Sequence, residues 1–266
     1  MNDLSRARLD RLLTGRFGKP YMLHATTGST NDDALAWAAR GAPEGALVAA
    51  EHQTAGRGRW DRRWLSRPGA SLLFSVLLRP ERPASALGLL TTAAGVAVAE
   101  GIEEACGLRC GLRWPNDVTA GGRKLAGVLV ETRLRAGTVT VAVVGVGINV
   151  DWPAADLPPE IAERATSIAS ELGRSGRPSS LDRAGLLAAV LGRLEDLYGV
   201  LGSPGLLDRA TQRSELLGQR VRVRRADGGT IEGTALRLVP SGALEIGGAG
   251  APVAVESGEI EWLRPR

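Results

Sequence analysis

Two apolar segments on either side of a tight turn constrain the fold of this chain more than any other feature. Residues 124–134 (KLAGVLVETRL) and 138–150 (TVTVAVVGVGINV) are rich in strand-forming residues, and Ala136-Gly137 lies between them. This pattern predicts an antiparallel β-hairpin. Because the segment 123–131 is apolar on both faces, its strand is expected to be buried within a larger sheet.

Shorter segments predict further strands and helices around this hairpin. Apolar runs predict strands, and apolar residues three or four apart predict helices. One helix would begin at Ser29 or Thr30 and end at Gly41. Residues 110–118 predict a strand broken by a proline turn, and 151–160 a loop. The other predicted strands are 21–26, 46–53 and 71–80, and the other predicted helices are 4–14, 84–106, 181–201 and 205–213.

The C-terminal residues follow a different pattern. From about residue 216, short strands alternate with glycine-containing turns, which is typical of a small β-barrel of SH3 size. The 266 residues suffice for one good-sized domain and one small one. We therefore predict two domains, residues 1–214 and residues 215–266.

Cysteine content and hydropathy indicate the compartment. Cys106 and Cys110 form neither a disulfide framework nor a Cys-x-x-Cys metal site. The N-terminus lacks the apolar core of a signal peptide. The most apolar stretch, 87–105, is interrupted by threonine, glycine and glutamate, so no run is expected to reach membrane-spanning length. We expect a reduced, cytoplasmic protein without a membrane partner.

Positive charge gathers in one loop, residues 53–67. The chain has a formal net charge of +4, and this loop alone carries five arginines and one aspartate. The rest of the chain is therefore neutral overall, whereas a nucleic-acid-binding protein usually presents a broad basic face. The charge distribution predicts a local pocket for an anion.

The first part of this loop, QTAGRGRWDRRW, has the chemistry for such a pocket. Glycines let the backbone approach a ligand closely, arginines offer planar forks to phosphate or carboxylate, and tryptophans offer a plate for an aromatic base. The alternative is a solvated surface loop. Neither of the two familiar glycine-rich phosphate-binding patterns is present. The residues concerned are Gly56, Arg57, Gly58, Arg59, Trp60 and Trp64.

Two short polar motifs are further candidates. GSTN (28–31) lies at a predicted helix start, where free backbone N–H groups can bind a polar ligand, although a plain helix cap is the simpler explanation. RWPND (113–117) places an amide and a carboxylate side by side at a proline turn, as a magnesium or ribose site requires. A turn in which Asn116 and Asp117 bond their own backbone is equally compatible.

The hairpin itself carries two more candidates. Lys124 lies at the mouth of its strand in a chain where 31 of 33 basic residues are arginine, so its retention suggests a charge aimed at an anion. A lysine that extends to solvent from a strand end is the alternative. Gly145 and Gly147 share one strand face and could make room for a ligand or for a sheet corner. His24 and His52 lack metal-ligand partners and are predicted to be structural, and RVRVRR (220–225) to be a solvated strand face.

In this order, the motifs GSTN, EHQTAGRGR…W, LRWPNDV, KLAGVLVE and GVGINV resemble those of the biotin protein ligases, also called biotin–[acetyl-CoA-carboxylase] ligases. The resemblance covers about residues 20–260. It implies an α+β fold with a mixed sheet flanked by helices, like a class II synthetase, and an SH3-like C-terminal domain. It also implies that biotin and ATP form biotinoyl-5′-AMP, and that biotin passes to a lysine of a biotin carboxyl carrier domain.

The resemblance also assigns roles to matching positions. Lys124, Arg57 and Arg59 would be catalytic, and Trp64, Asn116 and Asp117 would bind the nucleotide, with Asp117 on Mg²⁺ as well. The residues that would bind biotin or its adenylate are Ser29, Thr30, Asn31, Gln53, Arg57, Gly58, Arg59 and Lys124.

The sequence departs from the family pattern in the loop, where Trp60 and Asp61 occupy the middle, and at Arg113, where the family often has lysine. About 20 residues precede the first predicted strand, so we expect no winged helix and no operator binding. A monomer or weak homodimer is expected. The alternative functions are a lipoate–protein ligase-like acyl transferase, which shares the catalytic fold, and a non-catalytic nucleic-acid-binding module.

Overall fold

The structure is a computed structural model that describes residues 3–60, 62–177, 181–225, 227–248 and 250–263. Its larger sheet has eight strands in the described part of the chain, in the order β1-β2-β3-β8-β7-β6-β5, with β4 beside β8. The β1–β2 pair is parallel and every other pair is antiparallel. The strands are β1 (Tyr21–His24), β2 (Leu47–Ala50), β3 (Ser71–Leu78), β4 (Arg82–Pro83), β5 (Gly111–Arg113), β6 (Asp117–Ala120), β7 (Arg123–Arg135) and β8 (Thr138–Asn149).

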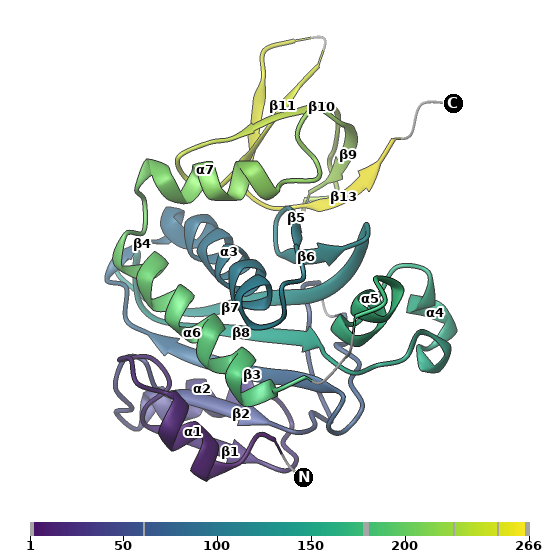
Figure 1. Ribbon diagram of the computed structural model, residues 1–266. Coiled ribbons are helices and arrows are strands. Elements are labelled where there is room, and N and C mark those ends of the chain that lie inside the picture. The colour runs from purple at the N-terminus through teal and green to yellow at the C-terminus, as the bar shows by residue number, and fades with distance from the viewer. Residues whose placement is uncertain (1–2, 61, 178–180, 226, 249, 264–266) are drawn as a thin grey trace.

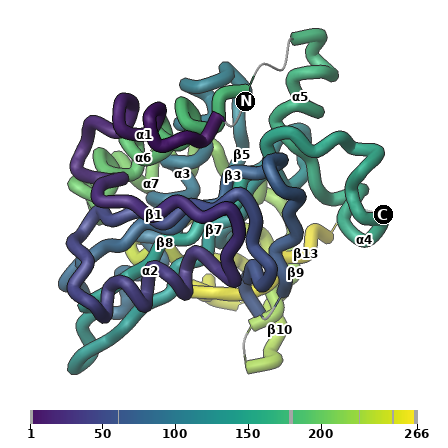
Figure 2. Tube along the Cα trace, turned by 90° about the horizontal axis from the view of Figure 1, so that it is seen from below, coloured from purple at the N-terminus to yellow at the C-terminus, as the bar shows by residue number. Residues whose placement is uncertain are grey.

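Helices cover the two faces of this sheet unequally (Figures 1 and 2). Most of the long helices lie on one side, and α2 (Thr30–Ala39) lies on the other. Two short helices form a separate lobe beyond the end of β8: α4 (Pro159–Ala162) and α5 (Ile168–Arg174). The helices of the crowded side are α1 (Arg6–Leu12), α3 (Leu87–Cys106), α6 (Arg183–Gly199) and α7 (Pro204–Arg213), and 3₁₀ turns span Ala84–Ala86 and Ala154–Asp156.

The alternation of side chains along β8 explains this asymmetry. Val144, Val146 and Ile148 point into the main core beneath α3 and α6. Val143 points to the other face, where it packs with α2. Successive strand residues alternate between faces, so Gly145, Gly147 and Asn149 continue the face of Val143 beyond the end of α2. This small-residue stretch is the floor of the site described below.

The hairpin of β7 and β8 forms as predicted, with Ala136 and Gly137 both at positive φ in its turn. The expectation that its first strand is buried on both faces is only partly correct. One face of β7 enters the core, while residues 127, 129 and 130 are half-buried and residues 133–135 are exposed. The opposite face of β7, which includes Gly127 and Leu129, borders the cavity described below.

Helix α3 is long and strongly apolar. With the preceding 3₁₀ turn it spans 23 residues, and its most apolar 18-residue window has a mean hydropathy of 1.5, so by length and composition it could cross a membrane, contrary to our expectation for this stretch. However, 67% of the most apolar window is buried inside the protein. Its buried residues pack against the sheet and α6, as expected of a core helix.

The C-terminal residues form a second, antiparallel sheet in the order β12-β11-β10-β9-β13. Its core is built from alternating strand residues, including Val221 and Val223 of β9, and is joined by Trp114 from the larger sheet. The Trp114 indole donates a hydrogen bond to the Gly242 carbonyl at 3.0 Å. The strands are β9 (Arg220–Arg224), β10 (Thr230–Leu238), β11 (Leu244–Gly247), β12 (Val253–Val255) and β13 (Glu259–Trp262).

The secondary structure agrees with the predicted order of elements, but the short strand β4 and the helices α4 and α5 were not predicted, and the predicted loop 151–160 contains a 3₁₀ turn and the start of α4. The two helices were not predicted because their few helical turns lie among prolines and lack a long apolar period. The mixed α+β class is confirmed, and the second antiparallel sheet is consistent with an SH3-like domain. The boundary at residue 214 remains a prediction.

Candidate active site

A cavity of about 1140 Å³ lies between the open face of the larger sheet, the arginine loop and the β9 and β13 strands of the C-terminal sheet. Nine basic side chains and four carboxylates line it among the described residues. The positive charge of the sequence is therefore concentrated on a concave site, as predicted. The predicted site residues all line it: Ser29, Thr30, Asn31, Gln53, Arg57, Gly58, Arg59, Trp64, Asn116, Asp117 and Lys124.

Glycines form the floor of the cavity because other side chains occupy the space above them. A Cβ atom on Gly145 would lie 2.2 Å from Asn31 Oδ1, and one on Gly147 would lie 2.5 Å from Trp64 Cε2. On the neighbouring strand β7, a Cβ on Gly127, the residue paired with Gly147, would lie 3.0 Å from Trp64 Cζ3. Gly145 and Gly147 therefore make room for Asn31 and the Trp64 ring, two side chains of the protein itself.

The arginine loop folds back on itself as a narrow hairpin. Trp64 N–H donates to the Gly56 carbonyl at 2.9 Å, and Gly58 N–H donates to the Arg62 carbonyl at 2.6 Å. A Cβ on Gly56 would lie 2.9 Å from the Trp64 carbonyl oxygen, so Gly56 allows the two arms to approach closely. Trp60, near the tip, has a φ of 59° and is 41% exposed.

The tip of the loop is attached to the C-terminal sheet. Glu259 of β13 forms ion pairs with Arg62 of the loop and with Arg224 of β9. Hydrogen bonding to Arg224 and the nearby charge of Arg62 lower the pKa of the Glu259 carboxyl. Arg59 donates to the Gly258 carbonyl at 3.2 Å. The second sheet thus forms a wall of the site and holds the loop over it.

Arg59 differs from the other catalytic candidates in its partners. It has no ion pair among the described residues; its other contacts are with Asn116 Oδ1 at 3.5 Å and with the Trp60 ring, 5.8 Å from its centroid. Burial lowers the pKa of the Arg59 guanidinium, although an arginine stays charged at neutral pH. Arg59 is therefore a half-buried cation that feels the charges of Asp117 and Glu259 without forming an ion pair with either.

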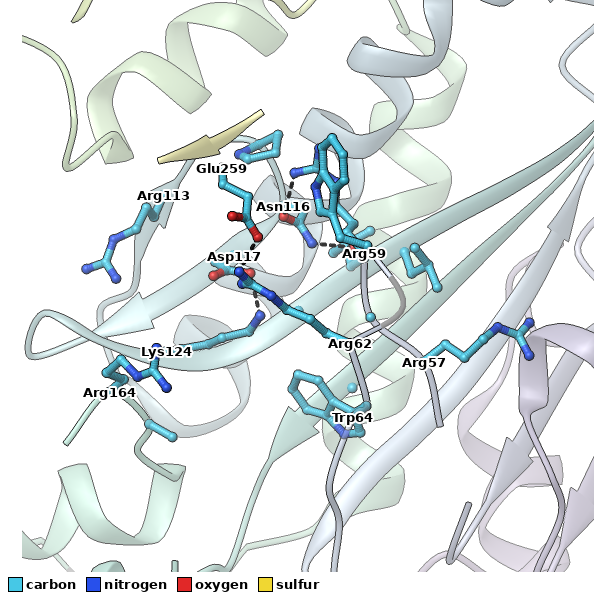
Figure 3. A pocket seen from close by; sticks show the side chains of 18 of the residues that line it. Arg57, Arg59, Arg62, Trp64, Arg113, Asn116, Asp117, Lys124, Arg164 and Glu259 are labelled. Carbon is cyan, nitrogen blue, oxygen red and sulfur yellow. Dashed lines mark hydrogen bonds and ion pairs between the residues drawn. The ribbon is translucent and has the colours of Figure 1, made fainter. Parts of the chain in front are cut away.

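Lys124 and Asp117 face each other across the β6–β7 pair (Figure 3). Lys124 Nζ lies 2.6 Å from Asp117 Oδ1 and 5.6 Å from the centroid of the Trp64 ring. Asn116 beside them donates to the Val128 carbonyl at 2.8 Å. The side chains of Asn116 and Asp117 thus contact β7, and the predicted alternative, in which they bond their own turn, does not apply. Lys124 and Asp117 form a charged pair inside the cavity.

The side chain of Trp64 covers the floor of the cavity below Lys124. Its indole N–H is buried and has no hydrogen-bond partner. A buried donor without a partner carries a free-energy cost, which an acceptor on a bound ligand would remove. The exposed face of the ring is available for stacking.

The segment around Ser29, Thr30 and Asn31 forms the other end of the cavity. α2 begins at Thr30, and Ser29 makes no side-chain capping bond, so the simple helix-cap explanation does not hold for it. Gln53 Oε1 accepts the Thr30 N–H at 2.7 Å and lies 3.1 Å from the Thr30 hydroxyl. Ser29, Thr30 and Asn31 are buried at this end of the cavity.

Arg57 lies at the outer side of the loop and turns away from Lys124 (Figure 3). It donates two hydrogen bonds of 2.6 Å to Asp32 and approaches Glu131 at 3.1 Å. Hydrogen bonding to Arg57 lowers the pKa of the Asp32 carboxyl, and Asp32 raises the pKa of Arg57. The charge of Arg57 is therefore matched by two carboxylates.

Residues that sequence reasoning did not select also line the cavity. Arg222 and Arg224 alternate with buried valines, so the predicted strand pattern is correct, but this face borders the site. Only the placement of β9 could reveal this. His24 and His52 are not among the lining residues. Other cavity residues without a predicted role include Arg113, Arg164, Glu259 and Trp262.

A magnesium ion would have to rely on substrate oxygens here. Among the described residues, no group of three or more histidine, cysteine, aspartate or glutamate side chains is arranged to hold a metal. Asp117 supplies one carboxylate, already paired with Lys124. One protein carboxylate plus phosphate oxygens is an ordinary Mg²⁺ environment in nucleotide sites, so Asp117 fits that role.

Comparisons with known proteins agree with this architecture. The model of the biotin/lipoate A/B protein ligase family matches residues 24–149. The chain is 37% identical over 247 residues to a biotin–[acetyl-CoA-carboxylase] ligase of Mycobacterium tuberculosis, covering 90% of this chain and 88% of that protein. It is 36% identical over 235 residues to the bifunctional ligase/repressor BirA of Bacillus subtilis, covering 88% and 71%.

A solved structure shares the whole fold. The biotin protein ligase of Aquifex aeolicus in complex with biotin and ATP superposes with a TM-score of 0.77 and 29% sequence identity, covering 93% of this chain and 100% of that one. Together with the ordered motifs that line the cavity, these similarities establish that the chain belongs to the biotin protein ligase family.

Proposed function

We propose that this protein activates biotin with ATP and transfers it to a lysine of a biotin carboxyl carrier domain of a carboxylase. The relatives that support this are a biotin–[acetyl-CoA-carboxylase] ligase and a biotin protein ligase bound to biotin and ATP. The single observation in this chain that carries the proposal is the cavity itself, in which every predicted biotin and nucleotide residue lines one space.

The first reaction joins two anions. A carboxylate oxygen of biotin attacks the α-phosphorus of ATP, a new O–P bond forms, and the bond to the departing pyrophosphate breaks. Fixed positive charge must offset the negative charge that accumulates at phosphorus. Lys124 and Arg59 both line the cavity near Asn116 and Asp117 and are suited to this task. No covalent protein nucleophile is needed, because holding both substrates in line supplies much of the acceleration.

The substrates divide the cavity between them in this proposal. Biotin lies toward Ser29, Thr30, Asn31 and Gln53, whose polar groups suit its ureido ring. The adenine stacks on the free face of Trp64, and Asn116 and Asp117 serve the nucleotide. When bound, Mg²⁺ at Asp117 would neutralise phosphate charge.

The pairing of Lys124 with Asp117 has a consequence for catalysis. At 2.6 Å the carboxylate holds the ammonium group in the cavity before substrates arrive. Lys124 can exchange Asp117 for a phosphate or carboxylate oxygen without a large movement. In the second reaction, a carrier lysine in its neutral form attacks the biotinoyl carbonyl, and AMP leaves.

The experiment that tests this function is biotin-dependent exchange of labelled pyrophosphate into ATP, which needs no carrier protein. Wild type should show exchange with biotin and none with lipoate. Lys124→Ala should lose on the order of 100-fold or more, the usual cost of removing an electrostatic stabiliser. Glu104→Gln, on the outer surface of α3, is the control and should exchange like wild type.

The outcomes separate the alternatives. Exchange with lipoate only would keep the fold and overturn the substrate. A folded wild type that exchanges with neither acid would refute the ligase proposal. Wild-type exchange in Lys124→Ala would leave biotin activation in place and remove Lys124 from the mechanism.

A further inference from the structure

Glu131 lies next to the proposed biotin subsite without forming part of its wall. It belongs to β7, opposite Val143 of β8, and faces the side of the sheet that carries the cavity. It is not among the residues that line the cavity. Its carboxylate instead contacts two residues that do: Asn31 and Arg57.

The two oxygens of Glu131 hold these partners at short range. Oε2 accepts a hydrogen bond from Asn31 Nδ2 at 2.6 Å and lies 3.1 Å from Arg57 Nη2. Oε1 lies 3.2 Å from the same Arg57 nitrogen. Hydrogen bonds to a charged acceptor are the stronger kind. Glu131 therefore connects the helix that carries Asn31 to the loop that carries Arg57.

Hydrogen-bond accounting fixes the orientation of Asn31. Glu131 can only accept, so the amide nitrogen of Asn31 faces it, and the amide oxygen faces Ser75 Oγ at 2.6 Å. Ser75 has one proton and must donate it to Asn31. The Thr30 hydroxyl lies 2.7 Å from Ser75 Oγ and 3.1 Å from Gln53 Oε1, so its proton has an acceptor on either side. Asn31 Nδ2 reaches the Leu129 carbonyl only at 3.4 Å, so Glu131 is its short-range acceptor.

Burial makes this arrangement matter. Ser75, Thr30 and Asn31 are at most 4% exposed, and a buried polar group that loses its partner costs more than the bond was worth. Arg57, by contrast, contacts two carboxylates: Asp32 through Nη1 and Nη2, and Glu131 through Nη2. Its position is thus set by these acids, and it attaches the first arm of the loop to α2 and β7.

We propose that Glu131 is a positioning residue for biotin activation, which holds Asn31 in the biotin subsite and Arg57 in the closed loop. The inference rests on the proposed function and adds a residue to it. Arg57 then acts by fixing the loop, and the positive charge near the phosphate comes from Arg59 and Lys124. Removing the charge of Glu131 should weaken biotin binding far more than it slows the chemical step.

The test is pyrophosphate exchange with Glu131→Gln, compared with Glu104→Gln, which removes a carboxylate paired with Arg193 on the surface. A glutamine can accept from Asn31 only by presenting its NH₂ group to Arg57, a donor. We expect the biotin KM of Glu131→Gln to rise about 10- to 100-fold, as for loss of a charge-assisted hydrogen bond. Its kcat and ATP KM should change by less than about threefold, and Glu104→Gln should match wild type.

A double-substitution cycle distinguishes positioning from a general structural defect. If Glu131 acts through Arg57, the rise in biotin KM of Glu131→Gln with Arg57→Gln should fall well short of the product of the single effects. Multiplicative effects would overturn the link to Arg57. An unchanged biotin KM in folded Glu131→Gln, or a loss confined to kcat, would overturn the proposal.

A second measurement does not depend on activity. Trypsin cleaves at arginine, and the loop at 53–67 contains five. If Glu131 holds the loop closed, Glu131→Gln should be cut in this loop several-fold faster than wild type and Glu104→Gln. Equal cleavage rates would refute the loop-holding role of Glu131, whether or not the wild type is active with biotin. A wild type that is inactive with biotin would refute the proposed function, and the cleavage rates would still test the loop-holding role.

Discussion

Substituting Gly147 by alanine should weaken ligand binding while leaving the fold stable. The new Cβ would lie 2.5, 2.7 and 2.8 Å from three atoms of the Trp64 ring, well inside van der Waals contact. The strand cannot move, because Gly147 is paired on both sides in the middle of the sheet. Trp64 belongs to the loop and can withdraw. The clash is therefore expected to displace the loop.

The size of the effect follows from the surface that the tryptophan ring covers. A buried tryptophan hides roughly 150–250 Å², and lifting the ring off the floor would expose about 100 Å² of it. At about 25 cal/mol per Å², this costs the closed loop about 2.5 kcal/mol, or about 70-fold in its population. We expect pyrophosphate exchange at low substrate concentration to fall by about that factor in Gly147→Ala.

A neighbouring glycine provides the matched comparison. Alanine at Gly145 would place its Cβ 2.2 Å from Asn31 Oδ1, and Asn31 is held by buried hydrogen bonds and cannot withdraw. Gly145→Ala should cost about 1–3 kcal/mol of folding stability, or a fall of roughly 2–12 °C in Tm. Gly192→Ala, exposed within α6 and without neighbours at its Cβ, should stabilise slightly and exchange normally.

Thermal unfolding and exchange are measured for the three alanine variants together. The reasoning would be refuted if Gly147→Ala kept wild-type activity at low substrate. It would also be refuted if Gly147→Ala lost as much Tm as Gly145→Ala, because the Trp64 ring would then be a fixed part of the core.

Three further predictions concern other parts of the molecule. Arg183 is 6% exposed and bonded to two carboxylates, so Arg183→Leu should cost about 3–5 kcal/mol in urea unfolding by leaving both acids unpaired; a loss under 1 kcal/mol would contradict this. The pKa of Glu259 is lowered by its two arginines, so the stability it adds is complete above its unfolded pKa near 4.3 and is lost as pH falls through the lowered value. Glu259→Gln should therefore have a lower Tm than wild type at pH 7 and the same Tm at a pH below the lowered pKa of Glu259. A Tm difference that stays constant with pH would argue against the ion pairs of Glu259 with Arg62 and Arg224. Burial raises the pKa of the Cys110 thiol to about 12, so its alkylation at pH 8 should be about 1,000-fold slower than in unfolded protein, as peptide mass spectrometry can measure.

The strands of the larger sheet were predictable because their chemistry is local. A period of two with valine-rich faces specifies a strand wherever it lies, and the β7–β8 hairpin needs only its turn residues at positive φ. The loop at 53–67 was predictable as a concentration of positive charge because arginine and glycine crowd into it. By contrast, α4 and α5 lack a long period and gave no comparable signal.

The partners of the charged residues were not predictable. Arg57, Arg59 and Lys124 are equivalent cations in the sequence, yet the fold gives Arg57 two carboxylates, Lys124 one, and Arg59 none among the described residues. Glu131 belongs to a motif quoted from the sequence, but its contact with Asn31 joins residues 100 positions apart. Such differences decide which cation can serve a phosphate.

The sequence by itself therefore determined the kinds of element, their order, and the residue types gathered for binding two anions. Each of these depends on short-range spacing, which the chain carries in any conformation. Only the tertiary structure decided that the glycine floor is covered by Trp64, that the C-terminal sheet forms a wall, and that Glu131 joins helix to loop. The physical reason is that these properties arise from contacts between distant segments, and burial and charge pairing have no value until the sheet brings those segments together.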